Sequence, residues 1–118
     1  MLLDTNIIIG LLAGTEAAVA SFRTKNVPLA RCSVSVITRI EVLSWQGMTP
    51  EADTKARALL AGLRVLPIIE EIEVATIALR RSRKVKLPDA LIAATAQAHG
   101  LQLLTLDQGL LSVFNDSN

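Results

Sequence analysis

The chain has 118 residues, a formal net charge of +1 and a mean hydropathy of +0.45, with 51% hydrophobic but only 3% aromatic residues. This length fits one domain, residues 1–118, with a core built from aliphatic side chains. The single cysteine and single histidine exclude an intrachain disulfide and the usual structural zinc sites. We expect a cytoplasmic protein without a membrane span, because Gln97, His99, Gly100 and Gln102 interrupt the uncharged stretch at 90–106. We expect no signal peptide, because the N-terminus has an acid at position 4 and no base before Arg23.

The N-terminal half alternates short apolar runs with helical segments. Leu2 and Leu3 predict a strand that ends before Asp4. Ser35 and Thr49 are favourable N-caps, and Pro28 excludes a helix around it. The predicted elements are a strand at 2–3, helices at 7–14 and 15–25, a strand at 27–33, helices at 35–45 and 49–63, and a strand at 64–69.

The C-terminal half continues this alternation. Residues 70–84 predict a helix with acids in its first turn and bases in its last, as the helix dipole favours. Residues 87–100 predict a second helix, with Pro88 at its start, and residues 101–106 predict a strand. Strands that alternate with helices indicate an α/β domain with a central, mostly parallel sheet. Ligands of such sheets bind beyond the carboxyl ends of the strands.

Four of the eleven acids are embedded among apolar residues, whereas the other seven lie on polar helix faces, in first turns or in the tail. Asp4 and Asp107 directly follow predicted strands, Asp89 begins a helix, and Glu41 lies at the border of an apolar helix face. Each also has a purely structural interpretation. Asp4 caps the next helix, Asp89 favours a positive helix end, Asp107 starts a turn with Gly109, and Glu41 pairs with Arg39 or a distant base.

If these acids converge, they need a positive partner. Two carboxylates about 6 Å apart repel by roughly 3 kcal/mol at an effective dielectric constant near 20. The bases nearest in sequence are Arg39, Lys84 and Lys86. A hard divalent cation relieves the repulsion directly, and oxygen ligands suit Mg²⁺ or Mn²⁺. The sequence therefore indicates metal-assisted hydrolysis of a phosphodiester.

Four segments together resemble the PIN-domain ribonucleases, and among them the toxins of VapBC toxin–antitoxin pairs. They are LLDTNIII, SVITRIEVL, LPDALIAATAQAHGL and LLTLD, which occur in the family's order over essentially the whole chain. The resemblance implies a three-layer α/β/α PIN-like domain with an acidic pocket at the strand ends. It also implies Mg²⁺- or Mn²⁺-dependent cleavage of RNA, a homodimer, and a cognate antitoxin whose tail covers the pocket.

The resemblance also assigns roles to individual residues. By position in the motifs, it implies that the catalytic acids are Asp4, Glu41, Asp89 and Asp107. Of these, Asp4, Asp89 and Asp107 are the expected metal ligands. The supporting polar residues are Thr5, Asn6, Ser35 and Thr105.

The last motif departs from the family pattern. Many members carry a second acid and an aromatic residue shortly after the fourth acid, whereas TLDQGLL has Gly109, Leu110 and Leu111 there. This departure supports an alternative, a catalytically weakened or silent PIN fold that acts as a binding module. A second alternative is a phosphorylated receiver domain. It lacks support, because no Asp ends the strand at 64–69 and no Lys follows the strand at 101–106.

The net charge of +1 does not indicate a nucleic-acid partner, but the chain contains a local basic run. It consists of Arg80, Arg81, Arg83, Lys84 and Lys86. These side chains are interpreted as contacts to RNA phosphates or to an acidic antitoxin segment, or as a solvated helix end. Trp45, at the end of a predicted helix, is interpreted as an aromatic at the edge of the core, with a partner anchor as the alternative.

Overall fold

The computed structural model describes residues 1–116, and residues 117 and 118 lie outside the described chain. Its centre is a four-stranded sheet in the order β3-β2-β1-β4, and every neighbouring pair is parallel. The strands are β1 (Leu2–Leu3), β2 (Ser33–Ser35), β3 (Arg64–Leu66) and β4 (Leu103–Leu104). The predicted parallel sheet is therefore confirmed, with β1 between β2 and β4.

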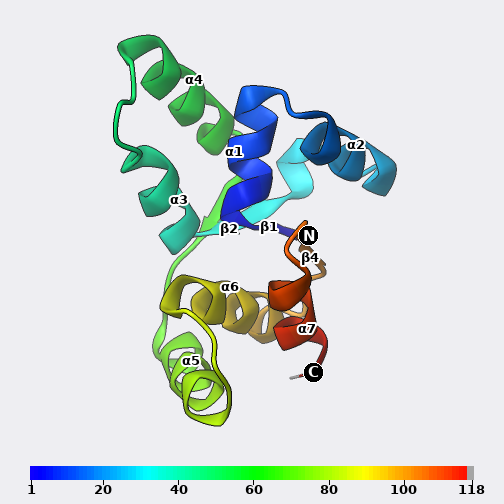
Figure 1. The fold of residues 1–118 in the computed structure, drawn as a ribbon, viewed down its shortest axis with the longest axis vertical. Coiled ribbons are helices and arrows are strands. Elements are labelled where there is room, and N and C mark those ends of the chain that lie inside the picture. The colour runs from blue at the N-terminus through cyan, green and yellow to red at the C-terminus, as the bar shows by residue number, and fades with distance from the viewer. Residues whose placement is uncertain (117–118) are drawn as a thin grey trace.

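Helices cover both faces of the sheet (Figure 1). On one side lie α1 (Thr5–Ala13), α2 (Glu16–Lys25), α3 (Val36–Leu43) and α4 (Pro50–Ala61). On the other side lie α5 (Glu70–Ser82), α6 (Leu87–Ala98) and α7 (Gln108–Asp116). Successive strand residues point to opposite faces, so Leu2 packs in the core below the sheet and Leu3 in the core above it. This is the predicted three-layer α/β/α fold.

The predicted strand at 27–33 is wrong in position. Residues Leu29–Arg31 form a 3-10 turn, in which the Cys32 N–H donates to the Leu29 carbonyl, and the strand begins only at Ser33. Proline at position 28 starts this turn, and the true strand carries two buried serines, Ser33 and Ser35, which lack the apolar signature of a strand. The strand at 64–69 is shorter than predicted, because Pro67 has no N–H to continue the ladder.

The helix caps agree better with the predictions. Asp4, Ser35 and Thr49 each accept a backbone N–H as the N-cap of the helix that follows. Close packing of α1 on α2 depends on Gly10, because a Cβ there would lie 2.4 Å from the Ala18 Cβ. The Asp4 cap therefore fixes the first turn of α1, and the close contact with α2 fixes the position of the whole helix.

No single helix in residues 1–116 is long and apolar enough to cross a membrane. The helices α1 and α2 meet that criterion only as a pair, and the chain bends by 112° between them.

Candidate active site

The carboxyl edge of the sheet brings together residues that are far apart in the sequence. Because β1 and β4 are hydrogen-bonded neighbours, with Leu3 paired to Leu104, the residues that follow them lie side by side. Asp4 follows β1, and Thr105 and Asp107 follow β4. The expectation that the two strand-end acids lie next to each other is confirmed. Helix α3 brings Glu41 to this edge, and helix α6 brings Asp89.

Asp4 is buried and fully engaged in hydrogen bonds. Its side chain is only 2% exposed, its Oδ1 accepts the Ile7 N–H at 2.8 Å, and its Oδ2 accepts the hydroxyl of Thr105. Burial raises the pKa of Asp4 above its ordinary value, the bonds from Thr105 and Ile7 lower it, and the charge of Asp107 raises it. Asp4 is thus a helix cap, as the structural interpretation proposed, and also lies next to a second acid.

Thr105 connects Asp4 to Asp107. While its hydroxyl donates to Asp4, its oxygen accepts the Asp107 N–H at 2.9 Å. The carboxylate of Asp107 accepts the Gly109 and Leu110 N–H groups through Oδ1, at 2.8 and 3.2 Å, and so caps α7. Its Oδ2 has no hydrogen-bond partner within residues 1–116. The turn with Gly109, proposed from the sequence, is therefore present.

Glu41 is held by a threonine of the neighbouring helix. The hydroxyl of Thr5, in the first turn of α1, donates to Glu41 Oε1 at 2.7 Å. Thr38, one turn before Glu41 on α3, lies 3.1 Å from the same hydroxyl and is completely buried. Thr5 was predicted as a supporting residue, and it contacts Glu41 directly. Thr38 was not predicted, although its spacing from Glu41 placed it on the same helix face.

Asp89 lies in the first turn of α6 and is partly buried. Burial raises the pKa of Asp89, the charges of Asp107, Glu41 and Asp4 raise it further, and Lys86 lowers it. Asp89 therefore lies close enough to the other three acids to feel their charges. All four predicted acids share one electrostatic environment, although they come from four separate segments of the chain.

Among residues 1–116, no basic side chain forms an ion pair with any of these four acids. The two ion pairs in the described chain, Arg57–Asp53 and Arg83–Asp116, involve none of them. No three of the described acids, histidines and cysteines stand in a ready-made metal-binding arrangement. The donor set is nevertheless all-oxygen and lacks a positive partner, which fits a hard divalent cation.

The side chains of the other two predicted supporting residues, Ser35 and Asn6, make no hydrogen bond to the site acids within residues 1–116. Ser35 is fully buried at the end of β2, but its Oγ accepts the Ile37 N–H at 3.2 Å as the cap of α3. Asn6 is exposed in the first turn of α1, and its backbone N–H lowers the pKa of Asp4. The structure thus assigns Ser35 to the helix cap, whereas Thr105 bonds directly to Asp4.

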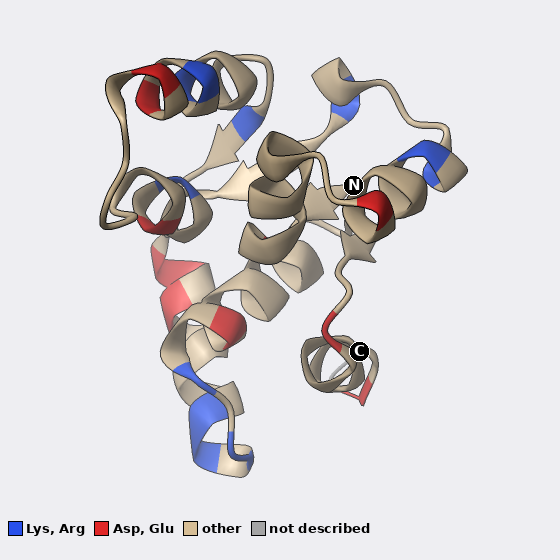
Figure 2. Cartoon of the chain, turned by 45° about the horizontal axis from the view of Figure 1, so that its top comes forward, with Lys and Arg blue, Asp and Glu red and all other residues tan. Residues whose placement is uncertain are grey.

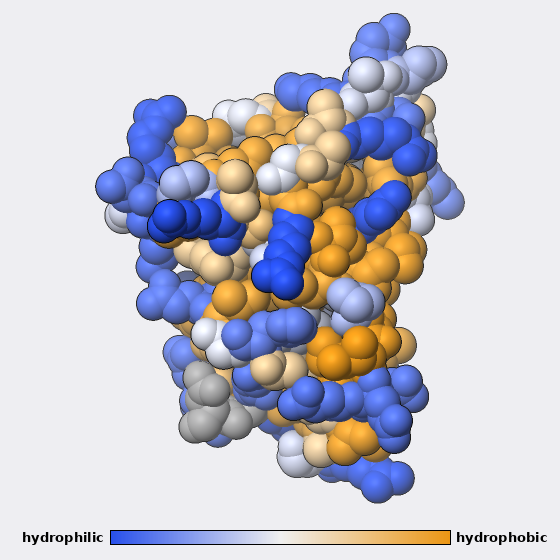
Figure 3. Space-filling view, turned by 180° about the vertical axis from the view of Figure 1, so that it is seen from behind, coloured by the Kyte–Doolittle hydropathy of each residue, from blue (hydrophilic) through white to orange (hydrophobic). Residues whose placement is uncertain are grey.

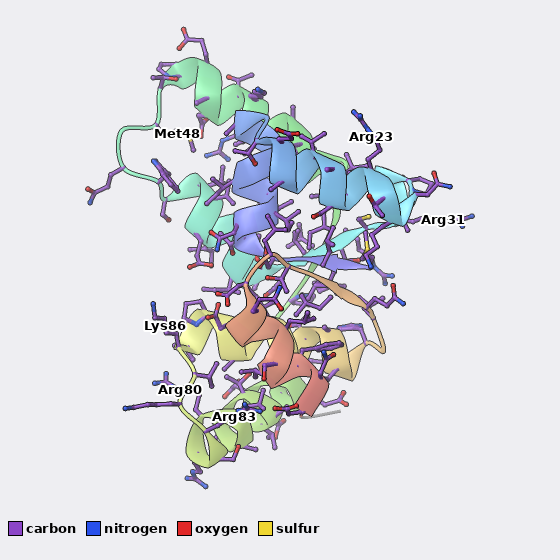
Figure 4. The ribbon with its side chains drawn as sticks, turned by 45° about the vertical axis from the view of Figure 1, so that its right-hand side comes forward. Arg23, Arg31, Met48, Arg80, Arg83 and Lys86 are labelled. Carbon is purple, nitrogen blue, oxygen red and sulfur yellow. The ribbon has the colours of Figure 1, made fainter. Side chains whose placement is uncertain are left out.

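The basic run leads from the end of α5 to the start of α6, next to Asp89 (Figure 2). Arg80 extends away from the molecule, whereas Arg83 turns toward α7 and pairs with Asp116 at 3.4 Å (Figure 4). Lys84 and Lys86 are exposed, and Lys86 directly precedes α6. Within this basic run, Lys86 is the residue whose charge lowers the pKa of a predicted site acid, Asp89.

Trp45, interpreted as an aromatic at the edge of the core, is 56% exposed. It borders an apolar hollow of about 380 Å³ between α1, α3 and α4, close to the loop that carries Met48 (Figure 4). The ring therefore lies at the rim of this hollow and does not fill the core. Apolar side chains also reach the surface on the face of the molecule seen from behind (Figure 3).

Comparisons with known proteins agree with this fold. The family described as PIN domain matches residues 1–114. The chain is similar to a structure titled a toxin–antitoxin complex from Klebsiella pneumoniae, with 35% identity and a TM-score of 0.78 over 90% of this chain and 85% of that one. It is also similar to FitAcB from Neisseria gonorrhoeae, with 25% identity and a TM-score of 0.73 over 97% of this chain and 92% of that one.

A structure of VapBC2 from Rickettsia felis, bound to a DNA fragment from its promoter, shares the fold alone. Its identity is 19% and its TM-score 0.76, over 97% of this chain and 92% of that one. A search of curated proteins finds no significant match. The family match covers nearly the whole chain, and the motifs that carry the resemblance lie at one edge of the sheet. The chain therefore belongs to the PIN domain family and is VapC-like, as its four sequence segments predicted.

Proposed function

We propose that this protein is a metal-dependent endoribonuclease and the toxin of a type II toxin–antitoxin pair, active as a single PIN-like domain in the cytoplasm. The observation that carries the proposal is the group of four acids at the carboxyl edge of the sheet, which share one electrostatic environment without a direct basic partner. A cluster of like charges that the fold leaves unneutralised favours a cationic cofactor.

In this proposal different residues of the chain bind the metal ion, activate the water and orient the acids. Asp4, Asp89 and Asp107 would hold Mg²⁺ or Mn²⁺, and Glu41 would orient the attacking water and take its proton. Thr105 fixes the orientation of Asp4, and Thr5 fixes that of Glu41. The bound cation supplies positive charge that offsets the negative charge that develops on the phosphate. Asn6 and Ser35 keep their supporting role through the first turns of α1 and α3.

The RNA chain approaches the site over the turn between α5 and α6. Lys86 and Lys84 are exposed there, and Arg80 and Arg81 end α5 nearby. Their charges attract phosphates without selecting a base sequence. Arg83 is the exception, because its guanidinium already pairs with Asp116. The same basic side chains are also suited to contact an acidic segment of the antitoxin.

The cognate antitoxin is proposed from the comparisons, because the structure from Klebsiella pneumoniae with 35% identity is titled a toxin–antitoxin complex. Its apolar part docks in the hollow beneath Trp45, which Ile9, Leu12 and Met48 also line. An aromatic ring that is half exposed beside such a hollow is a typical anchor for a partner. Its tail then covers the acidic edge and inhibits cleavage.

The proposed homodimer uses the apolar surface of α3 and α5. Ile40, Val74 and Ile77 are 52%, 61% and 49% exposed, and the last two lie one turn apart on α5. Pairing two copies removes these side chains from water. Equilibrium sedimentation of the wild type and of the Val74→Glu variant tests this, and a wild type that is monomeric at micromolar concentration contradicts it.

The experiment that tests the main proposal measures cleavage of single-stranded RNA in the presence and absence of Mn²⁺. We expect cleavage by the wild type that stops with a chelator and that is lost in Asp4→Asn and in Asp89→Asn. The same two variants should relieve the growth arrest that the wild type causes on expression. Growth arrest that persists in both variants contradicts the nuclease proposal.

The alternative, a catalytically silent binding module, rests on the segment TLDQGLL, which has Gly109, Leu110 and Leu111 where many family members carry a second acid and an aromatic residue. Calorimetry separates the two functions before any substrate is known. Binding of Mn²⁺ below millimolar concentration supports the nuclease, whereas no binding at millimolar Mn²⁺ supports the silent module.

A further inference from the structure

Thr38 is a fully buried polar residue of α3 that lies one turn before Glu41. It lies in the first turn of α3 with 0% exposure, and its hydroxyl lies 3.1 Å from the hydroxyl of Thr5. No other hydrogen bond of this side chain is present within residues 1–116. A buried hydroxyl without a partner destabilises the folded state, so this contact across two helices is required for the fold as well.

Two other buried threonines show what such residues do elsewhere in this chain. Thr76 and Thr95, 4% and 0% exposed, each donate to the carbonyl four residues earlier in their own helix, at 2.7 Å. Thr38 has no helical carbonyl behind it, because the residue four positions earlier belongs to β2. The Thr38 hydroxyl instead contacts Thr5 of α1, whereas the hydroxyls of Thr76 and Thr95 bond only within their own helices.

The number of protons sets the direction of these hydrogen bonds. The Thr5 hydroxyl has one proton, and Glu41 Oε1 lies 2.7 Å from its oxygen. An ionised carboxylate only accepts, so the Thr5 proton points to Glu41. The contact between the two hydroxyls then requires Thr38 to donate and Thr5 to accept. The result is a one-way chain from Thr38 to Thr5 to Glu41, in which each bond strengthens the next.

We propose that Thr38 is a positioning residue that acts on Glu41 through Thr5. By occupying the acceptor site of the Thr5 hydroxyl, Thr38 fixes the Thr5 proton on Glu41 Oε1 and so sets the rotamer of that carboxylate. Oε2, which has no hydrogen-bond partner among the described residues, is left for the reacting water. This inference rests on the proposed nuclease function and extends it to a residue that does not touch the substrate.

The test compares three variants with matched burial. Thr38→Val removes the hydroxyl and keeps a similar shape, and Thr38→Ser keeps the hydroxyl. Thr95→Val is the control, because that residue is equally buried but bonds only to its own helix. Crystal structures of each give the distance from Thr5 Oγ1 to Glu41 Oε1. Steady-state cleavage of RNA gives kcat and KM separately, and thermal unfolding confirms that each variant folds.

We expect Thr38→Val to move the Glu41 carboxylate off Thr5 and to lower kcat by about 10-fold, with little change in KM, as loss of an outer-shell partner does. Thr38→Ser should keep the Glu41 carboxylate on Thr5 and the kcat of the wild type, and Thr95→Val should leave the carboxylate position and kcat unchanged. A Thr38→Val variant with Glu41 in place and kcat intact overturns the proposal. So does a Thr38→Ser variant as impaired as Thr38→Val, because shape and not the hydroxyl would then matter.

Failure of the proposed function gives a different result. If the wild type cleaves no RNA, the nuclease proposal is wrong. The crystallographic distance still decides whether Thr38 orients Glu41, because it requires neither substrate nor metal. A Glu41 carboxylate that stays on Thr5 in Thr38→Val rejects the positioning role whatever the activity of the wild type.

Discussion

The two halves of the acidic edge differ in how firmly the fold holds them. In the inner half, Asp4 and Glu41 each accept a hydrogen bond from a threonine of another element, and Asp4 is almost completely buried. In the outer half, Asp107 is exposed and bonds only to backbone N–H groups, and no hydrogen bond within residues 1–116 holds the Asp89 carboxylate. The protein therefore pre-orients one half of the site and leaves the other half to a ligand.

This difference has an electrostatic cause. Helix α1 and Thr105 supply donors that compensate for the burial of Asp4. Asp89 has no such donors, and its pKa is raised by burial and by three neighbouring acids. A bound cation offsets this repulsion. We therefore expect changes in the inner half to damage the protein's function most, and changes in the outer half to alter mainly its response to metal.

The largest effect is expected from Asp4→Asn. Cleavage of RNA should fall by roughly 10³-fold, because losing the several kcal/mol that a bound cation supplies corresponds to about three decades in rate. The folded state should survive, because an amide oxygen still accepts the Ile7 N–H. Asp53→Asn, which changes an acid in a surface ion pair, is the matched control. Equal activity of the two variants in a cleavage assay contradicts the role of Asp4.

Asp107 allows its two roles to be separated. Asp107→Asn keeps an oxygen that caps α7 but removes the charge, whereas Asp107→Ala removes both. We expect both variants to lose cleavage, and only Asp107→Ala to lose stability, by about 1 kcal/mol for a missing cap. Urea unfolding measures the stability. A loss of cleavage in Asp107→Ala alone shows that this acid is only a cap.

A smaller effect is expected from Lys86→Gln. If Lys86 contacts a phosphate, the variant should bind single-stranded RNA more weakly, and the slope of log affinity against log salt should decrease by about 0.7. Lys25→Gln, at the far end of α2, is the control and should keep the slope of the wild type. Fluorescence anisotropy over a range of salt concentrations measures both. An unchanged slope in Lys86→Gln removes this residue from the RNA path.

The smallest expected effect is the pH dependence of the free energy of unfolding, measured without a metal ion. In the folded protein the pKa values of Asp4 and Asp89 are raised above the ordinary value of 3.8. Between 3.8 and these raised values the folded protein binds more protons than the unfolded chain, so the contribution of these acids to stability falls as pH rises and is constant above that interval.

The difference in unfolding free energy between wild type and Asp89→Asn isolates one of these acids. Measured with a chelator present, the wild type should lose stability relative to the variant as pH rises through that interval. Adding Mn²⁺ at neutral pH should stabilise the wild type more than the variant. A wild type that gains stability relative to the variant over the same pH interval contradicts the raised pKa of Asp89.

The sequence predicted where the two strand-end acids lie because their neighbours are informative. Asp4 follows two leucines and Asp107 follows another apolar run, so parallel strands had to bring them to one edge. The strand β2 was misplaced because its register depends on Ser33 and Ser35, whose burial only the neighbouring strands explain. A buried serine in a strand and an exposed serine in a loop have the same sequence signal.

Thr38 illustrates a second limit of the sequence. Its spacing from Glu41 was visible, but a threonine in an amphipathic helix is most simply explained as a residue that bonds to its own backbone. Only the approach of α1, fixed by the Asp4 cap and by the close contact of Gly10 with Ala18, brings Thr5 to it. Such contacts depend on how helices pack, which local patterns do not determine.

The central claim, that the acidic edge is a site for a divalent cation, is tested most directly by titrating Mn²⁺ into the wild type and into Asp4→Asn in a calorimeter, with Asp53→Asn as the control. The account predicts saturable binding by the wild type and the control below millimolar Mn²⁺, and its loss in Asp4→Asn. Equal binding by the wild type and Asp4→Asn, or no binding by the wild type at millimolar Mn²⁺, would contradict it.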